Sequence, residues 1–90
     1  MYGLVSQLRR ASVSVASNIA EGRGRLNPGE FRQFLGVALG STFEIQTQLV
    51  VAGKLKMGSE SAINEAAALS DEVSKMLTSF IHKLSSKAKS

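Results

Sequence analysis

The stretch RRASVSVASNIAEGRGRLNPGEF, residues 9–31, contains both the end of one helix and the start of the next. Gly22 favours a helix end, because glycine readily adopts the left-handed conformation that releases a chain from a helix. Asn27 can cap the following helix, Pro28 suits its first position, and Glu30 can reach back as the capping-box partner. The stretch therefore predicts two helices joined by a short turn.

Apolar residues recur at helical spacing on both sides of this turn and again toward the C-terminus. A second turn, GKLKMG at 53–58, precedes Ser59, which can cap a third helix. Because both turns are short, consecutive helices are expected to be antiparallel neighbours. The sequence predicts an all-α fold, an up-down antiparallel helical bundle with three helices in this chain. The expected helices cover residues 3–22, 28–52 and 59–84, within one domain at 1–85 that is followed by a frayed basic tail at 86–90.

Each predicted helix has an apolar stripe that we expect to form the core. In the first helix, further valines and alanines widen this stripe past half of the circumference, so a further helix or an identical subunit must cover it. In the second helix, Gly36 and Gly40 lie four residues apart, and each costs about 1 kcal/mol relative to alanine. This pair predicts the close approach of a neighbouring backbone. The stripe of the third helix comprises Ala62, Ala66, Leu69, Val73, Met76, Leu77, Phe80 and Leu84.

Composition excludes several classes of function. The chain has 90 residues, of which 43% are hydrophobic and 20% charged, as expected of one globular domain. It has no cysteine, so disulfides, thiolate catalysis and cysteine-based zinc sites are excluded. Its one histidine, His82, cannot supply the two Glu-x-x-His pairs of a di-iron bundle. We therefore expect that the protein is not an enzyme and that it binds no cofactor, metal or membrane. We expect a cytoplasmic location.

The net charge of +4 favours an anionic partner, although an excess of this size also fits a solvated surface. Arginine suits phosphate better than lysine does, because its planar group can form two parallel hydrogen bonds. The start of the second helix also offers unpaired N–H groups to a phosphate. No aromatic pair of the kind that stacks bases is present, so binding would use the nucleic-acid backbone and shape. The candidate nucleic-acid-binding residues are all five arginines, Arg9, Arg10, Arg23, Arg25 and Arg32.

Other polar residues are interpreted as structural. Glu21 and Glu44 could form a carboxylate pair across two helices, but pairing of either with a nearby arginine is the favoured interpretation. The amide of Asn18 is expected to tie the end of the first helix to a neighbouring backbone group. The full set of expected structural and turn residues is Asn18, Glu21, Gly22, Asn27, Glu30 and Glu44.

Four segments, QLRRA at 7–11, NIAEG at 18–22, EF at 30–31 and ALGSTFE at 38–44, carry a resemblance to a known family. The chain resembles the bacterial four-helix bundle proteins related to those encoded by intervening sequences in 23S rRNA genes. This resemblance implies an up-down bundle that assembles into a ring-like homo-oligomer, a pentamer. The chain is also similar in fold to the accessory protein of diversity-generating retroelements, a basic ring that binds nucleic acid and a reverse transcriptase.

One departure from the family concerns the N-terminus. Family members begin with an additional helix before the position of Tyr2, so the resemblance implies that the first of four helices is missing here. Either the chain is a fragment or a shortened gene product, or three helices suffice because subunits cover the exposed faces. The wide apolar stripe of the first predicted helix fits a lost partner.

Two hypotheses for the function follow. The first is a non-enzymatic, homo-oligomeric bundle that binds structured RNA or DNA through an arginine-rich surface. The second is an oligomeric scaffold or adaptor that binds another protein through the apolar groove left by the absent helix. Salt dependence separates the two, because neutralising phosphates makes affinity fall steeply with salt, whereas groove binding does not.

Overall fold

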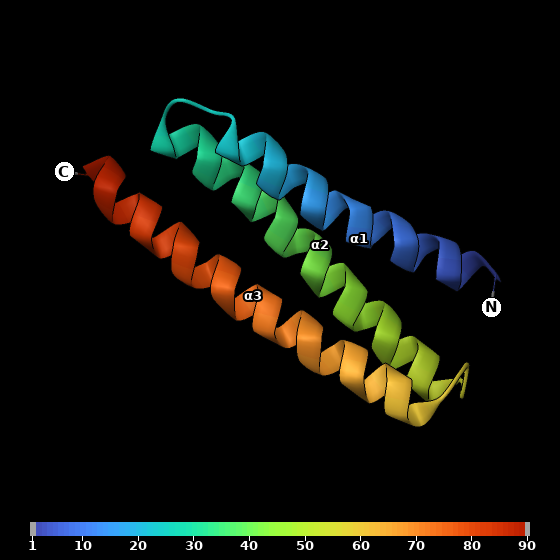
Figure 1. The fold of residues 1–90 in the computed structure, drawn as a ribbon. Helices are drawn as coiled ribbons and strands as arrows, with labels where there is room; N and C mark the ends of the chain where they lie inside the picture. The colour runs from blue at the N-terminus through green and yellow to red at the C-terminus, as the bar shows by residue number, and fades with distance from the viewer. Residues whose placement is uncertain (1, 90) are drawn as a thin grey trace.

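The computed structural model describes the backbone of residues 2–89 and the side chains of residues 3–86. Three helices, α1 (Tyr2–Arg23), α2 (Pro28–Lys54) and α3 (Glu60–Lys89), run up, down and up (Figure 1). The central α2 packs on both of the others, whereas α1 and α3 make no close backbone contact with each other within the described residues. The predicted all-α, up-down arrangement is confirmed, and residues 2–89 include no strand.

The helix ends differ from prediction mainly in α3, which continues to Lys89, so the tail expected to fray from residue 86 is helical through that residue. Alanine and lysine are good helix formers, and lysines near a helix C-terminus interact favourably with its dipole. α2 also extends two residues further than expected. It ends where Lys56 takes a left-handed conformation, with φ of 54°, and the Met57 N–H donates to the Ala52 carbonyl at 2.9 Å.

The core lies along one side of α2. Leu35 and Ala38 are fully buried there and pack with Leu77 and Leu84 of α3. Part of the predicted α3 stripe is wrong, because Leu69, Met76 and Phe80 are 57%, 68% and 44% exposed.

The glycines show where helices approach closely. A Cβ placed on Gly22 would lie 2.7 Å from Cδ1 of Phe31, so α1 and α2 touch at this residue. Gly36 and Gly40 have no neighbour within 4 Å of an added Cβ. The prediction that a neighbour approaches them is therefore wrong within this chain. They lie on a solvent-facing side of α2 that we call the outer face: Gly36, Val37, Gly40, Phe43 and Thr47.

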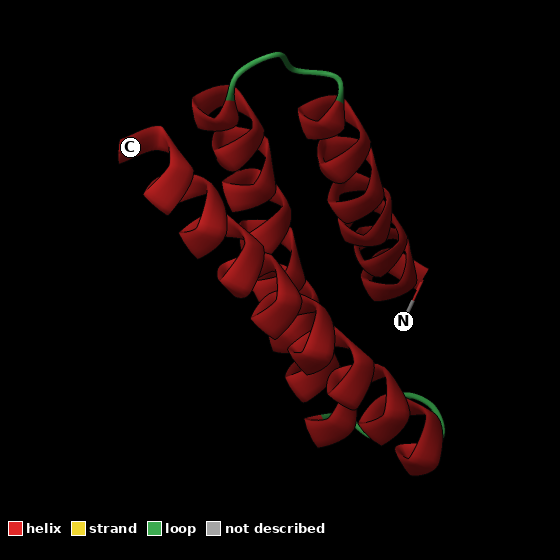
Figure 2. Cartoon of the chain, turned by 60° about the vertical axis from the view of Figure 1, so that its left-hand side comes forward, coloured by secondary structure: helices red, strands yellow, loops and turns green. Residues whose placement is uncertain are grey.

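The three helices form an elongated layer whose extents along the principal axes are 48 × 19 × 13 Å. Figure 2 shows α1 at one side of α2 and α3. By length and composition α2 alone among the described helices could cross a membrane, with 28% of its apolar window buried. Its central position in the layer also explains that composition, so this is a weak indication of a membrane segment.

Candidate nucleic-acid interface

Arg9 and Arg10 lie next to each other in the first half of α1 and are both exposed. Successive helix residues point about 100° apart, so the two guanidinium groups leave different sides of the helix. Arg23 lies within about 40° of Arg9 around the helix axis, because the fourteen residues between them make nearly four turns. Neither Arg9 nor Arg10 forms an ion pair among the described side chains. Both groups are therefore available to an anion.

Arg23 and Arg25 follow at the end of α1, but their surroundings differ. Arg25 donates to Oε2 of Glu21 at 3.2 Å, and its Cζ lies 4.7 Å from the ring centre of Phe34. An exposed ion pair and an exposed cation–π contact each contribute about 1 kcal/mol or less. Arg25 is thus held in place, whereas Arg23 is exposed and forms no ion pair within residues 3–86.

Arg32 is half-buried near the start of α2. Its Nη1 donates to Oγ of Ser85 at 3.3 Å, so the side chain bridges α2 and α3. This contact gives Arg32 a structural role at the end of the layer and leaves less of the guanidinium for a ligand.

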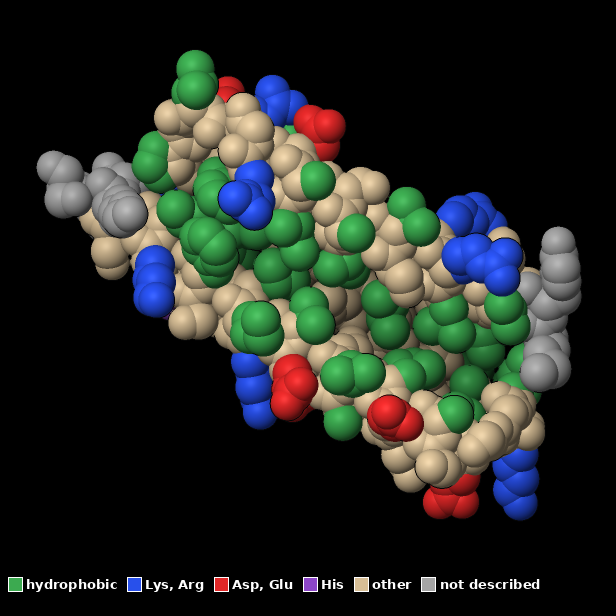
Figure 3. Space-filling view, viewed as in Figure 1, with side chains coloured by type: hydrophobic (Ala, Val, Ile, Leu, Met, Phe, Trp, Pro, Cys, Tyr) green, Lys and Arg blue, Asp and Glu red, His purple; other side chains and the backbone are tan. Residues whose placement is uncertain are grey.

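The five arginines do not converge on one site. Arg9 and Arg23 are fourteen residues apart on a single helix, which corresponds to about 21 Å along its axis. On the face shown in Figure 3, basic side chains lie along α1, on α3 and near the α2–α3 turn, and acidic ones lie near the α1–α2 turn and along α3. Spaced positive groups of this kind suit a repeating phosphate backbone better than a small ligand.

The N-terminus of α2 has few donors left for a phosphate. Asn27 caps the helix and its Oδ1 accepts from the Glu30 N–H at 2.8 Å. The Phe31 N–H donates to the Asn27 carbonyl, and Pro28 has no N–H. In this first turn only the N–H of Gly29 is left, and the carboxylate of Glu30 lies close by and repels anions. The geometry gives little support to the expected phosphate contact at this helix start.

Asn18 belongs to a polar connection between α1 and α2. Its Nδ2 donates to the Ser14 carbonyl at 2.8 Å, and Oγ of Ser14 lies 2.8 Å from Oγ of Ser41. The amide thus bonds within its own helix. Sequence analysis missed the Ser14–Ser41 contact, because two serines on predicted helices do not by themselves indicate that they face each other.

Either Glu21 or Glu44 was expected to pair with a nearby arginine. Glu21 has Arg25 as its partner, whereas Glu44 accepts a 3.4 Å hydrogen bond from Nε2 of Gln48. The expected arginine pair therefore forms at Glu21, and Glu44 has no arginine partner among the described side chains. Oε1 of Gln48 is buried without a hydrogen-bond partner.

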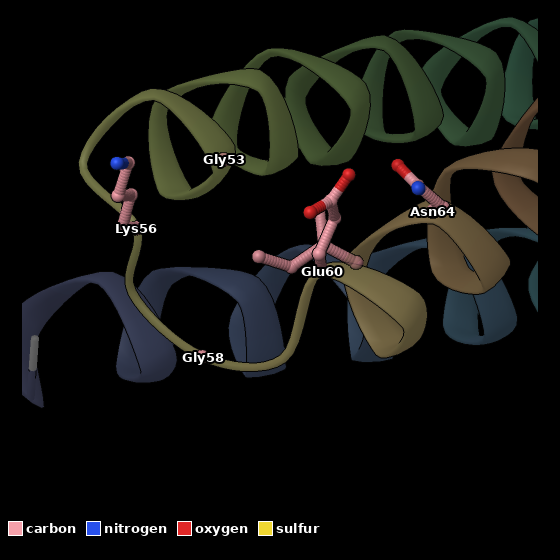
Figure 4. Close-up of a pocket in the computed structure, with 6 residues that line it drawn as sticks. Gly53, Lys56, Gly58, Glu60 and Asn64 are labelled. Carbon is pink, nitrogen blue, oxygen red and sulfur yellow. The ribbon is translucent and has the colours of Figure 1, made fainter.

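The described residues offer little for catalysis. All seven acidic residues and His82 are exposed, and no group of three potential metal ligands comes together within the described residues. A hollow of about 590 Å³ lies beside the α2–α3 turn, where Lys56, Glu60 and Asn64 line it (Figure 4). All three of these side chains are exposed, so the hollow is an open surface beside the turn.

A larger apolar groove runs between α1 and α3 above α2, with a volume of about 700 Å³. We call it the α1/α3 groove, and hydrophobic side chains gather there in Figure 3. Arg23 lines it as well. In the sequence, the wide apolar stripe of the first predicted helix indicated an uncovered apolar surface here. The α3 residues that line the groove were instead predicted to form the core. Its apolar lining includes Ile19, Phe31, Leu35, Val73, Met76 and Phe80.

A family model described as 23S rRNA-intervening sequence protein matches residues 1–79. A search of curated proteins found no match to the chain. The matched residues include all of α1 and α2, all five arginines, and most of α3. The segments that carry the resemblance therefore lie within one continuous match, and the chain belongs to the 23S rRNA-intervening sequence protein family.

Proposed function

We propose that this chain is a non-enzymatic, homo-oligomeric helical bundle protein that binds structured RNA or DNA through an arginine-rich surface. The proposal rests on Arg9, Arg10 and Arg23, which are exposed on α1 and have no carboxylate partner among the described side chains. Arg25 extends this surface at the turn, in a position fixed by Glu21 and Phe34. Arg32 of α2 belongs to the proposed surface through the part of its guanidinium group that does not bond Ser85.

Binding of this kind reads the phosphate backbone and the shape of the nucleic acid. Among the described aromatic residues, Phe43 and Phe80 are exposed, and Phe80 lines the α1/α3 groove. Few side chains are thus free to stack on bases, which favours backbone contact over sequence readout. In a closed homo-oligomer, such as the pentamer implied by the family resemblance, the arginine surface repeats around the assembly and increases affinity through multivalency. The assembly needs no cofactor and acts in the cytoplasm.

The test is fluorescence anisotropy of a labelled RNA hairpin and a labelled DNA duplex, titrated with the protein from about 50 to 200 mM salt. The variant Arg9→Gln/Arg10→Gln removes two positive charges from α1. For duplex DNA, each phosphate contact adds about 0.9 to the negative slope of log K against log salt. We expect the variant to bind more weakly and to reduce the slope by about 2 if both groups touch phosphate.

The matched control is Lys54→Gln/Lys56→Gln, which removes the same charge at the exposed α2–α3 turn. A specific arginine surface predicts a smaller loss for this control than for the arginine variant. Equal losses would show that binding reflects net charge alone. If the wild-type protein binds neither nucleic acid at low salt, the proposal is wrong.

The α1/α3 groove supports one alternative, an oligomeric scaffold that binds a protein partner without nucleic acid. Its apolar lining and open position are those of a surface that accepts an amphipathic helix. Binding there depends on buried apolar area, so its affinity would change little between 50 and 200 mM salt, in contrast to phosphate binding. The salt titration therefore separates the two functions.

A further inference from the structure

A shallow hollow lies on the solvent-facing side of α2, in the first half of the helix. Its volume is about 520 Å³, within the range of roughly 300–1,000 Å³ that sites for small ligands occupy. The hollow exists because Gly36 has no side chain, and an added Cβ there would meet no atom within 4 Å. Its lining residues all belong to α2: Gln33, Phe34, Gly36 and Val37.

Arg25 joins this hollow to the arginine-rich surface. Its Cζ lies 4.7 Å from the ring centre of Phe34, and its Nη2 donates to Oε2 of Glu21 at 3.2 Å. The guanidinium group is therefore held against a ring that lines the hollow. A guanidinium group has five N–H donors, and the bond to Glu21 uses one of them. Donors thus remain for a phosphate beside the hollow.

The chemistry of the hollow suits a neutral planar ring better than an anion. None of its lining residues is charged, and Phe34 and Val37 present apolar surface. Glu30 precedes Gln33 and Phe34 by three and four residues on the same helix, so its carboxylate lies near and disfavours a phosphate inside the hollow. The side-chain amide of Gln33 offers a donor and an acceptor to the edge of a base. Aromatic rings and guanidinium planes are the groups on which proteins stack unpaired bases of RNA loops and bulges.

The hollow stays open when the α1/α3 groove is filled. Phe31 and Leu35 of α2 line the groove, whereas Gly36 and Val37 lie on the nearly opposite side of the same helix. A helix packed in the groove, such as the additional one that the family resemblance implies before Tyr2, would therefore leave the hollow accessible. In a closed ring the hollow recurs once in each subunit, next to the arginines of the α1–α2 turn.

We propose that this hollow binds one unpaired base of a structured RNA, while Arg25 contacts the phosphate next to that base. The inference rests on the proposed function and names the feature that the arginine-rich surface selects, a loop or bulge beside a helical stem. Phe34 is half-buried, so stacking covers only part of the base. Phosphate contacts therefore supply most of the affinity, and the base contact adds a preference for unpaired nucleotides.

The first test fills the hollow and measures binding to two RNAs. Fluorescence anisotropy compares a labelled hairpin that has an unpaired loop with a blunt-ended duplex of the same stem. Gly36→Leu places a side chain in the hollow and is expected to raise the Kd for the hairpin about tenfold, as loss of one stacked base does. The Kd for the duplex is expected to stay the same. A hairpin with abasic loop nucleotides should bind the wild type as weakly as the intact hairpin binds the variant.

Thr47→Leu is the matched control. Thr47 is exposed on the same outer face, three turns beyond the hollow, and does not line it. Gly40 is less suitable, because a helical side chain leans toward the N-terminus and a leucine there would lean toward Gly36. Leucine is a better helix former than glycine or threonine, so both variants should keep their helicity by circular dichroism. Thr47→Leu is expected to bind both RNAs as the wild type does, and light scattering should give both variants the wild-type molar mass.

Several outcomes would overturn the proposal. They are an unchanged Kd of Gly36→Leu for the hairpin, an equal loss in Thr47→Leu, and an equal loss of Gly36→Leu for hairpin and duplex. A lower molar mass of Gly36→Leu would also overturn it, because a neighbouring subunit would then occupy the hollow.

The same titrations separate this inference from the proposed function. If Gly36→Leu binds the hairpin normally while Arg9→Gln/Arg10→Gln binds it weakly, the proposed function stands and this inference fails. If hairpin binding depends on Gly36 but not on Arg9 and Arg10, the hollow binds its base without the arginine surface of α1, and the proposed function fails in that respect. A wild-type chain that binds neither RNA would overturn both.

Discussion

Small residues lie both at the contact between α1 and α2 and on the outer face of α2, but a neighbouring helix of the chain covers only those at the contact. At the contact, Gly22 lets Phe31 approach so closely that no Cβ fits between the helices. Ser14 and Ser41 meet there through their hydroxyl groups. On the outer face, Gly36 and Gly40 meet nothing within the chain, and the large side chains beside them are exposed.

Small residues at helical spacing thus identify a surface suited to close packing, but they do not show which element packs on it. α2 has two flanks occupied by its own chain and further apolar surface that is not covered. Stability of the single chain is therefore concentrated along the flanks. Substitutions at the flanks and on the outer face should give effects of different size and, for glycine, of different sign.

Leu35→Ala is expected to have the largest effect on the stability of the single chain. Leu35 is 1% exposed and lies in the core cluster with Ala38 and Leu77, so truncation leaves a cavity. The free energy of unfolding of the variant should be lower than that of the wild type by about 2–5 kcal/mol, as measured by urea denaturation. Val37→Ala, on the outer face, should change the same quantity by less than about 0.5 kcal/mol. Similar losses at the two positions would contradict the division between flank and outer face.

Gly22→Ala is the next largest change. The added methyl would lie 2.7 Å from Cδ1 of Phe31 and 3.1 Å from Cβ of Phe34, so α2 or its ring must move. Overpacking of this kind costs about 1–3 kcal/mol, to be measured by the same denaturation experiment.

Gly24→Ala is the matched control, because its Cβ would lie at an ordinary 3.5 Å from the Glu21 carbonyl oxygen. We expect a change below about 0.5 kcal/mol for this control. A tolerated Gly22→Ala would mean that α1 shifts on α2 without cost, and that the close contact does not fix the position of α1.

Much of the fold could be predicted because local signals agreed with one another. Asn27, Pro28 and the apolar spacing on either side of them indicated the α1–α2 turn, and the structure has a cap there. The end of α2 was predicted less well, since the chain turns at Lys56 with a positive φ that lysine rarely adopts. Glycine is the usual sequence signal for a helix end, so the helix was predicted to end at residue 52, before Gly53.

The candidate site was predictable in composition but not in geometry. The arginines could be found by counting, whereas the partners of Arg25 and Arg32 depend on which helix faces bring Phe34 and Ser85 near. The exposure of Met76 was missed for a related reason. Helical spacing shows that residues share a side, and it does not show whether the chain itself has a helix to cover that side.

Gly36→Ala and Gly40→Ala are expected to have the smallest effects and the opposite sign. Each added Cβ would meet open space, and alanine is favoured over glycine inside a helix by about 0.5–1 kcal/mol. The melting temperature should therefore rise by about 2–8 °C per substitution, measured at one low protein concentration where the chain is monomeric. The same melt at high protein concentration tests whether a neighbouring subunit packs on the outer face. If the gain persists there, nothing packs closely on the outer face in the assembly. If the gain turns into a loss, a neighbouring subunit packs closely against these two glycines, as α2 packs against Gly22.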